Sequence, residues 1–77
     1  MCDYNICNRA DENIFYKQCL AIEKHIPNLD KDSLLTDVDN SLIQIYRSGK
    51  STIRVYNDVS IDAVYVKSDI PLEPFFK

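Results

Sequence analysis

The sequence predicts an α+β fold in which an N-terminal helix packs on a small antiparallel sheet of three to four strands. Residues 10–26 carry apolar side chains at helical spacing, which is typical of a helix with one buried face. Residues 41–57 alternate between apolar and polar side chains on either side of the only glycine, as the strands of a hairpin do. Residues 61–67 form a third β-rich run. A small closed β-barrel with the same helix is the alternative, if residues 34–38 form a strand.

The helix over residues 10–26 has start and stop signals as well as periodicity. Asn8 or Asp11 can cap its N-terminus, since both side chains accept hydrogen bonds from free backbone N–H groups. Pro27 disfavours helical geometry at the residue before it and marks the end. The predicted buried face consists of four side chains: Phe15, Cys19, Ile22 and Ile26.

The length of the hairpin loop can be argued from the alternation of the two strands. A two-residue turn of Gly49 and Lys50 would pair Ile45 with Arg54 and mix core with solvent on one face. A three-residue loop pairs Ile45 with Ile53 instead, so we predict that loop. One face is then aliphatic and buried: Ile43, Ile45, Ile53 and Val55. The opposite face is exposed: Leu42, Gln44, Tyr46, Thr52, Arg54 and Tyr56.

Other segments give weaker signals. Residues 28–39 fit a short second helix, which we favour, but they could also open a strand. For the third strand, residues 61–67, the pattern leaves open which face is buried. The C-terminal tail, residues 68–77, contains two prolines and is expected to run extended along the surface.

Length and composition indicate one globular domain over residues 1–77. A content of 45% hydrophobic and 27% charged residues is too apolar for intrinsic disorder. We divide the domain into an N-terminal arm (1–9), the helix (10–26), the antiparallel strands (41–67) and the tail (68–77). The chain shows no targeting segment and no apolar stretch of membrane-spanning length. We therefore expect a cytoplasmic protein with no membrane partner.

The residues that could bind a metal have the wrong spacing. Cys2, Cys7, Cys19 and His25 follow the pattern C-x4-C-x11-C-x5-H, which lacks the closely spaced ligand pairs of zinc sites. The odd number of cysteines in a chain without an export signal also argues against a disulfide framework. We expect reduced thiols, no metal and no cofactor.

Catalytic motifs are equally weak. The string Gly49-Lys50-Ser51 resembles the end of a phosphate-binding loop, but the first glycine of that motif falls on Gln44. The single histidine, His25, lies at a predicted helix end, and the aspartates lie at turns and caps, where they usually serve as local hydrogen-bond acceptors. We expect that the protein is not an enzyme.

The distribution of charge is more informative. The formal net charge is −3, which repels nucleic acid and anionic lipid at long range. Residues 46–56 are nevertheless a basic island between acidic flanks, with Arg47, Lys50 and Arg54 beside Tyr46 and Tyr56. Basic side chains interleaved with aromatic rings can contact a protein surface or pair with phosphates and stack on bases.

The sequence thus favours a small acidic, non-catalytic protein-binding module that inhibits or regulates a protein target. Immunity proteins, antitoxins and phage-encoded inhibitors act in this way, and the comparison rests on class analogy. The target could itself be basic, and a homo-oligomer could form through a sheet edge or the C-terminal tail. The alternative is a nucleic-acid-binding regulator that uses the hairpin 46–56. The candidate binding residues are Tyr46, Arg47, Lys50, Arg54, Tyr56, Asp37, Asp39, Phe75 and Phe76.

Overall fold

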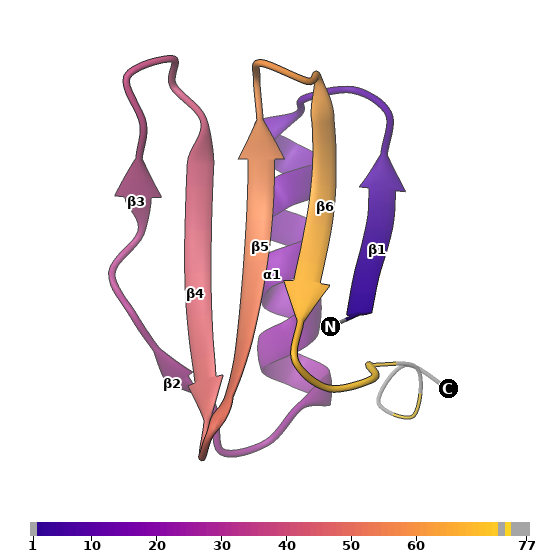
Figure 1. Ribbon diagram of the computed structural model, residues 1–77, viewed down its shortest axis with the longest axis vertical. Helices are drawn as coiled ribbons and strands as arrows, with labels where there is room; N and C mark the ends of the chain where they lie inside the picture. Colours follow the sequence, from indigo (N-terminus) through magenta and orange to yellow (C-terminus); the bar gives the residue numbers. More distant parts are fainter. Residues whose placement is uncertain (1, 73, 75–77) are drawn as a thin grey trace.

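The protein consists of one helix packed against one face of an open sheet, while the other face of the sheet carries no helix in the described part of the chain (Figure 1). The computed structural model describes residues 2–72 and Pro74. The elements follow in the order β1 (Cys2–Cys7), α1 (Glu12–His25), β2 (Asp30–Lys31), β3 (Leu35–Thr36), β4 (Leu42–Ser48), β5 (Ser51–Asp58) and β6 (Ala63–Ser68).

The sheet is antiparallel throughout. Within the described residues it contains six strands in the order β1-β6-β5-β4-β2, and β3 also pairs with β4. The chain passes from β1 at one edge to β2 at the other through α1, which crosses behind the central strands. The predicted α+β class with an antiparallel sheet is confirmed. The sheet is larger than predicted, and the closed-barrel alternative is wrong because the sheet is open.

Two segments joined the sheet against expectation. Cys2–Cys7, predicted as an arm, is the edge strand β1, because pairing with β6 lets the half-buried Tyr4 and Cys7 pack against the core. Residues 28–39 do not form the predicted helix. The backbone N–H of Asp32 donates to the Ile45 carbonyl at 3.0 Å, so this segment extends along β4 instead.

α1 confirms the predicted helix with bounds shortened to Glu12–His25. Asp11 is the N-cap, and its carboxylate accepts from the N–H groups of Asn13 at 2.8 Å and Ile14 at 3.3 Å. Ile26, before Pro27, has extended geometry and ends the helix. The predicted face is buried as expected: Phe15, Cys19, Ile22 and Ile26.

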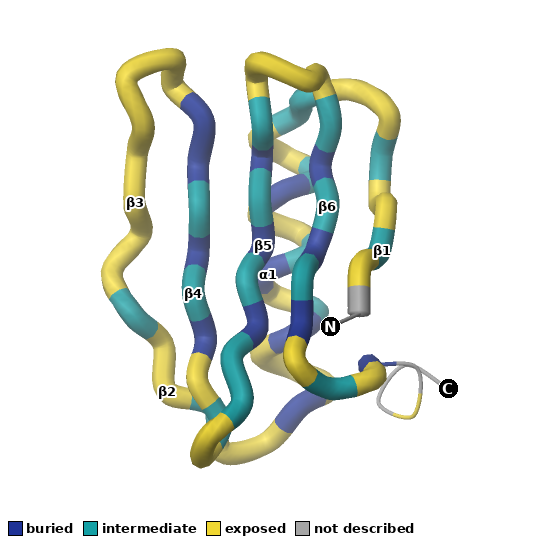
Figure 2. Tube along the Cα trace, viewed as in Figure 1, coloured by how far each residue is buried: buried dark blue, intermediate teal, exposed yellow. Residues whose placement is uncertain are grey.

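The predicted register of the hairpin is wrong. The loop is the two-residue turn Gly49-Lys50, Ser48 pairs with Ser51, and Ile45 pairs with Arg54. The buried and half-buried positions alternate along the three central strands (Figure 2). The inner face carries Leu42, Gln44, Tyr46, Ile53, Val55, Asn57, Val64, Val66 and Ser68. Ile43 and Ile45 therefore lie on the outer face, opposite to Ile53 and Val55.

This register is stable because the polar side chains that it buries find partners. The Gln44 amide donates to the Asp32 carbonyl at 2.6 Å, and the Tyr46 hydroxyl donates to the Glu23 carboxylate at 2.6 Å. Asn57 accepts from the N–H of Asp11 at 3.0 Å. In the described residues, no buried side-chain nitrogen or oxygen lacks a hydrogen bond. Burial of these groups is thus compensated, and Tyr46 adds a large ring to the core.

Gly49 adopts a left-handed conformation with φ of 60° at the first position of the turn, while Lys50 keeps a negative φ. This combination is typical of the type II′ turn, which favours glycine at that position.

We predict that Gly49→Ala lowers the free energy of unfolding by about 1–2 kcal/mol through backbone strain alone, because a Cβ there meets open space. Urea denaturation measures the loss. Gly49→Asn, which tolerates this conformation better, is expected to cost less; equal stability of all three proteins would contradict the assigned turn.

The two isoleucines report directly on the register. Ile53 is fully buried, so Ile53→Ala is expected to cost about 2–5 kcal/mol, whereas the outward-facing Ile45→Ala is expected to cost about 1 kcal/mol or less. The two variants remove the same atoms and serve as each other's control in thermal or urea unfolding. Equal losses would indicate that both side chains share one face.

Candidate binding surface

The outer face of the sheet is built from the residues that alternate with the core. A line of side chains crosses it at one level, since the registers pair Leu35 with Ile43, Ile43 with Tyr56, and Tyr56 with Tyr65. The rings of Tyr56 and Tyr65 stack with centroids 4.7 Å apart and an interplanar angle of 14°. We call these two residues the tyrosine pair. Because β5 and β6 lie between other strands of the sheet, the pair places an aromatic surface on the open face away from its edge strands.

The tyrosine pair is held in a fixed orientation. The Tyr65 hydroxyl donates to the Asp58 carboxylate at 3.1 Å, and the Lys67 ammonium lies 5.8 Å from the centre of the Tyr65 ring. Burial, followed by the hydrogen bond to Asp58, raises the pKa of Tyr65 to about 12. The phenol therefore stays neutral and remains a donor at physiological pH.

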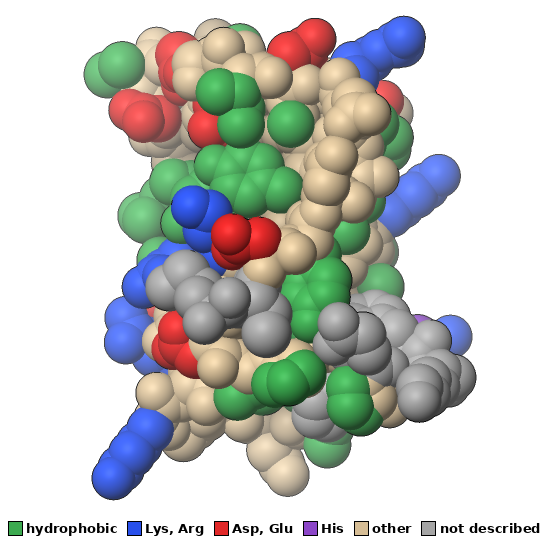
Figure 3. Space-filling view, turned by 45° about the vertical axis from the view of Figure 1, so that its right-hand side comes forward, with side chains coloured by type: hydrophobic (Ala, Val, Ile, Leu, Met, Phe, Trp, Pro, Cys, Tyr) green, Lys and Arg blue, Asp and Glu red, His purple; other side chains and the backbone are tan. Residues whose placement is uncertain are grey.

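A basic row lies one step along the strands from the tyrosine pair. Arg54 pairs with Lys67 across β5 and β6, and Arg47 lies further along β4. The Arg47 guanidinium contacts the Asp32 carboxylate at 2.8 Å, so this cation is partly neutralised. Figure 3 shows hydrophobic, basic and acidic side chains side by side on this surface.

An acidic pocket lies on the other side of the tyrosine pair. It has a volume of about 240 Å³ and is lined by Asp37, Asp39, Ser41, Ile43, Tyr56, Asn57, Asp58, Ser60 and Tyr65. The aspartates are oriented by their own turns: Asp37 accepts from the N–H of Val38 at 2.7 Å, and Asp39 accepts from that of Ser41 at 3.0 Å. Hydrogen bonds, first of all from the Ser60 hydroxyl, lower the pKa of Asp58. The pocket is thus lined by two tyrosine rings and three carboxylates, among other residues.

The structure brings together some of the residues that the sequence selected and separates others. Arg47, Arg54 and Tyr56 share the outer face, and Tyr56 meets Asp37 and Asp39 at the acidic pocket. Lys50 is exposed in the hairpin turn, away from the pocket. Tyr46 lies on the inner face beneath α1, and Phe75 and Phe76 lie outside the described residues.

Sequence reasoning missed the β6 half of the surface, Tyr65 and Lys67. The predicted faces of β5 are correct, so the missing information was the register between β5 and β6, which pairs Tyr56 with Tyr65 and Arg54 with Lys67. Ile43 and Ile45 were missed because the predicted register between β4 and β5 is wrong.

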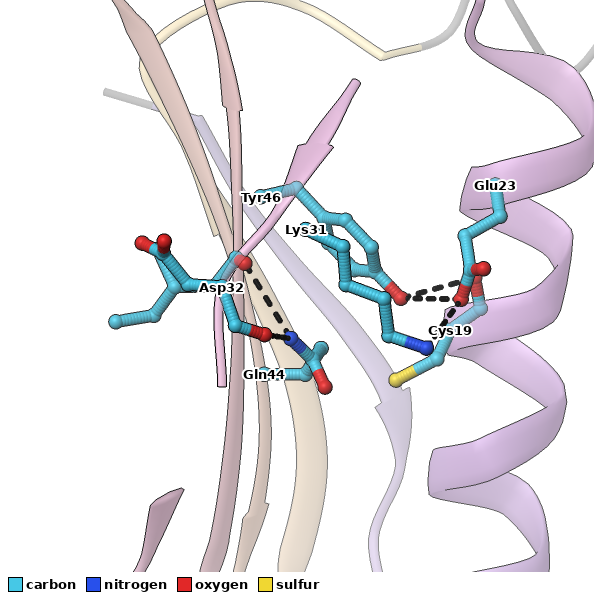
Figure 4. A network of polar contacts seen from close by, with 7 residues as sticks. Cys19, Glu23, Lys31, Asp32, Gln44 and Tyr46 are labelled. Atoms are coloured by element: carbon cyan, nitrogen blue, oxygen red, sulfur yellow. Dashed lines mark hydrogen bonds and ion pairs between the residues drawn. The ribbon is translucent and has the colours of Figure 1, made fainter. Parts of the chain in front are cut away.

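On the inner side, Tyr46 joins the sheet to the helix through a small polar network (Figure 4). Its hydroxyl lies 2.6 Å from Glu23 Oε2 and 3.4 Å from the Cys19 carbonyl oxygen, and Lys31 Nζ lies 3.3 Å from the same Glu23 oxygen. Burial and the hydrogen bond to Glu23 raise the pKa of Tyr46 far above its ordinary value. These contacts fix α1 on β4.

The cysteine nearest to this network is buried. Burial raises the pKa of the Cys19 thiol, which is 5% exposed, so the nucleophilic thiolate is disfavoured. Cys7 and Cys19 are free thiols. In residues 2–72 and 74, no group of three or more His, Cys, Asp or Glu side chains is arranged to hold a metal ion. Within the same residues, the structure contains no helix with the length and hydropathy of a membrane span.

The Tyr46 hydrogen bond makes stability depend on pH. The bond lowers the pKa of Glu23, so its contribution is complete above the unfolded pKa of the carboxyl and is lost as pH falls through the folded value. We predict that Tyr46→Phe lowers stability by about 1–2 kcal/mol at neutral pH and reduces the further loss below about pH 4.5. Urea midpoints of both proteins across this range measure the effect. Parallel pH profiles would show that Tyr46 does not act on Glu23.

Comparison with known proteins gives no family for this fold and surface. No family model, curated protein or solved structure matches the chain. The candidate function therefore rests on the chemistry of the surface itself.

Proposed function

We propose that the chain is a non-catalytic protein-binding module that inhibits or regulates a protein target with a basic surface. The target docks on the outer face of the sheet at the acidic pocket. The observation that carries this proposal is the meeting of Asp37, Asp39 and Tyr56 in one pocket with Asp58 and Tyr65.

The pocket suits a cationic side chain of a protein partner. A guanidinium or ammonium group can pair with the carboxylates of Asp37, Asp39 or Asp58 while it lies against the ring of Tyr56 or Tyr65. Because the turns already orient the aspartates, little side-chain entropy is lost on binding. Tyrosine is also enriched at energetically important interface positions.

The remainder of the face supplies contact area around this anchor. Ile43, Ile45 and Tyr56 are half-buried on the outer side, and Arg54 and Lys67 provide polar contacts beyond them. An apolar centre with a charged rim is the usual anatomy of a protein interface. Fixed carboxylates at one end also accelerate association with a basic target.

A nucleic-acid-binding regulator remains the second candidate, because the tyrosine pair lies beside Arg54 and Lys67. Stacked aromatic rings next to basic side chains suit single-stranded nucleic acid. Two features favour a protein partner instead: Arg47 is paired with Asp32, and the acidic pocket adjoins the same rings and repels phosphate.

Affinity capture from the source cell tests the primary proposal. We expect the wild-type chain to retain a specific basic protein at low salt and to lose much of it at high salt. The variant Asp37→Asn with Asp39→Asn keeps the turn acceptors but removes two charges, and it is expected to weaken the purified complex by more than about tenfold in calorimetry.

Glu12→Gln with Asp30→Asn is the matched control, since it removes the same two charges from outside the pocket. Failure to recover any specific protein, or equal affinity of both double variants, contradicts the proposal. A low-salt gel shift with single-stranded oligonucleotides, abolished by Arg54→Glu, would support the nucleic-acid reading instead.

A further inference from the structure

On the outer face, residues of opposite charge lie on the two sides of the tyrosine pair. Along β5, Arg54 precedes Tyr56 by two residues and Asp58 follows it by two, so all three side chains point outward. Successive outward residues on a strand lie about 6.6–6.8 Å apart. Along the backbone, a basic residue and an acidic residue therefore flank Tyr56 at equal spacing in opposite directions.

The neighbouring strand repeats the pattern on the basic side. Lys67 lies beside Arg54, Tyr65 beside Tyr56, and the small Ala63 beside Asp58. Among residues 2–72 and 74, Arg54 has no carboxylate within ion-pair distance, whereas Arg47 and Lys31 each have one. The Arg54 guanidinium is thus available to an external carboxylate.

We propose that the outer face binds a second copy of this chain in a two-fold symmetric dimer. The axis lies in the interface plane along the tyrosine pair, across the strands. A two-fold rotation about this line places Arg54 of one copy opposite Asp58 of the other, and the reverse pair forms by symmetry. Tyr56 and Tyr65 meet the same rings of the second copy, where offset or edge-on aromatic contacts can form.

Size and electrostatics are compatible with this arrangement. The two longer extents of the molecule are 30 and 24 Å. The sheet faces the viewer in Figure 1, which looks down the shortest axis, so the face spans both of these extents. Its area approaches the ~800 Å² per partner that a standard interface buries. Each copy carries a net charge of −3, which opposes association. At physiological salt the Debye length is about 8 Å, so paired charges across the interface outweigh the repulsion between whole molecules.

The dimer also affects target binding. This consequence, unlike the dimer itself, rests on the proposed function. The second copy covers Tyr56, Tyr65 and Asp58, which also line the acidic pocket. Target and second copy therefore compete for one face, and self-association lowers the concentration of free binding sites.

Charge reversal with rescue tests the dimer without any target. In Arg54→Glu homodimers, two carboxylates oppose each other at each site; in Asp58→Lys homodimers, two cations do. Mixing the two variants restores both opposite-charge pairs in the heterodimer. We expect sedimentation equilibrium to show wild-type dimers, at least about tenfold weaker association of each variant alone, and recovery in the mixture.

Lys17→Glu on the exposed side of α1 changes net charge by the same amount as Arg54→Glu and is the matched control, expected to dimerise like the wild type. Circular dichroism checks the fold of each variant, because Asp58 also bonds Ser60 and Tyr65. If Asp58→Lys does not fold, the comparison of Arg54→Glu with Lys17→Glu still decides. A monomer up to millimolar concentration, or a dimer insensitive to Arg54→Glu, overturns the proposal without bearing on target binding.

Discussion

The hydrogen bond between Tyr46 and Glu23 is the interaction on which the orientation of the whole sheet depends. It lets β4 turn a tyrosine toward α1, because the hydroxyl reaches a carboxylate instead of remaining unsatisfied in the core. Side chains of a strand alternate with a period of two, so this choice on β4 fixes every neighbouring strand through the registers. The II′ turn at Gly49 agrees with it, since a two-residue loop pairs Tyr46 with Ile53. Local turn chemistry and the helix contact therefore specify the same face.

Among residues 2–72 and 74, the one helix packed on the sheet is α1, on its inner face, and the composition of the outer face follows from the same register. With Ile53, Val55, Val64 and Val66 inside, the alternating positions must carry Arg54, Tyr56, Tyr65 and Lys67 outside. Their half-buried state reflects mutual coverage, with the tyrosine rings stacked and Lys67 over one of them. The face is thus ordered before any partner arrives, which reduces the entropy lost on binding.

Sequence alone predicted the helix well because its signals are local: the apolar spacing, the Asp11 cap and the Pro27 stop all lie within one segment. The two strands of the hairpin form where they were predicted, but their register differs from the prediction. The parity argument assumed that aliphatic side chains lie inside and polar ones outside. It failed at Gln44 and Tyr46, whose partners, Asp32 and Glu23, lie 12 and 23 residues away. The N-terminal strand β1 was missed for a related reason, because its pairing partner β6 is at the other end of the chain. Non-local partners decide burial of polar groups, and no local pattern contains them.

The binding surface was predictable in its residue types but not in its grouping. Arg54 and Tyr56 were selected for basic and aromatic character, and Asp37 and Asp39 for a separate acidic segment; only the β3–β4 turn, which folds back beside β5, joins the two sets. The result is a face with cations on one side of an aromatic line and carboxylates on the other. A purely basic partner matches only the acidic side and leaves Arg54 and Lys67 opposed by like charge. A partner that covers the whole face must therefore carry charges of both signs in the reverse order, and this chain is one molecule that does.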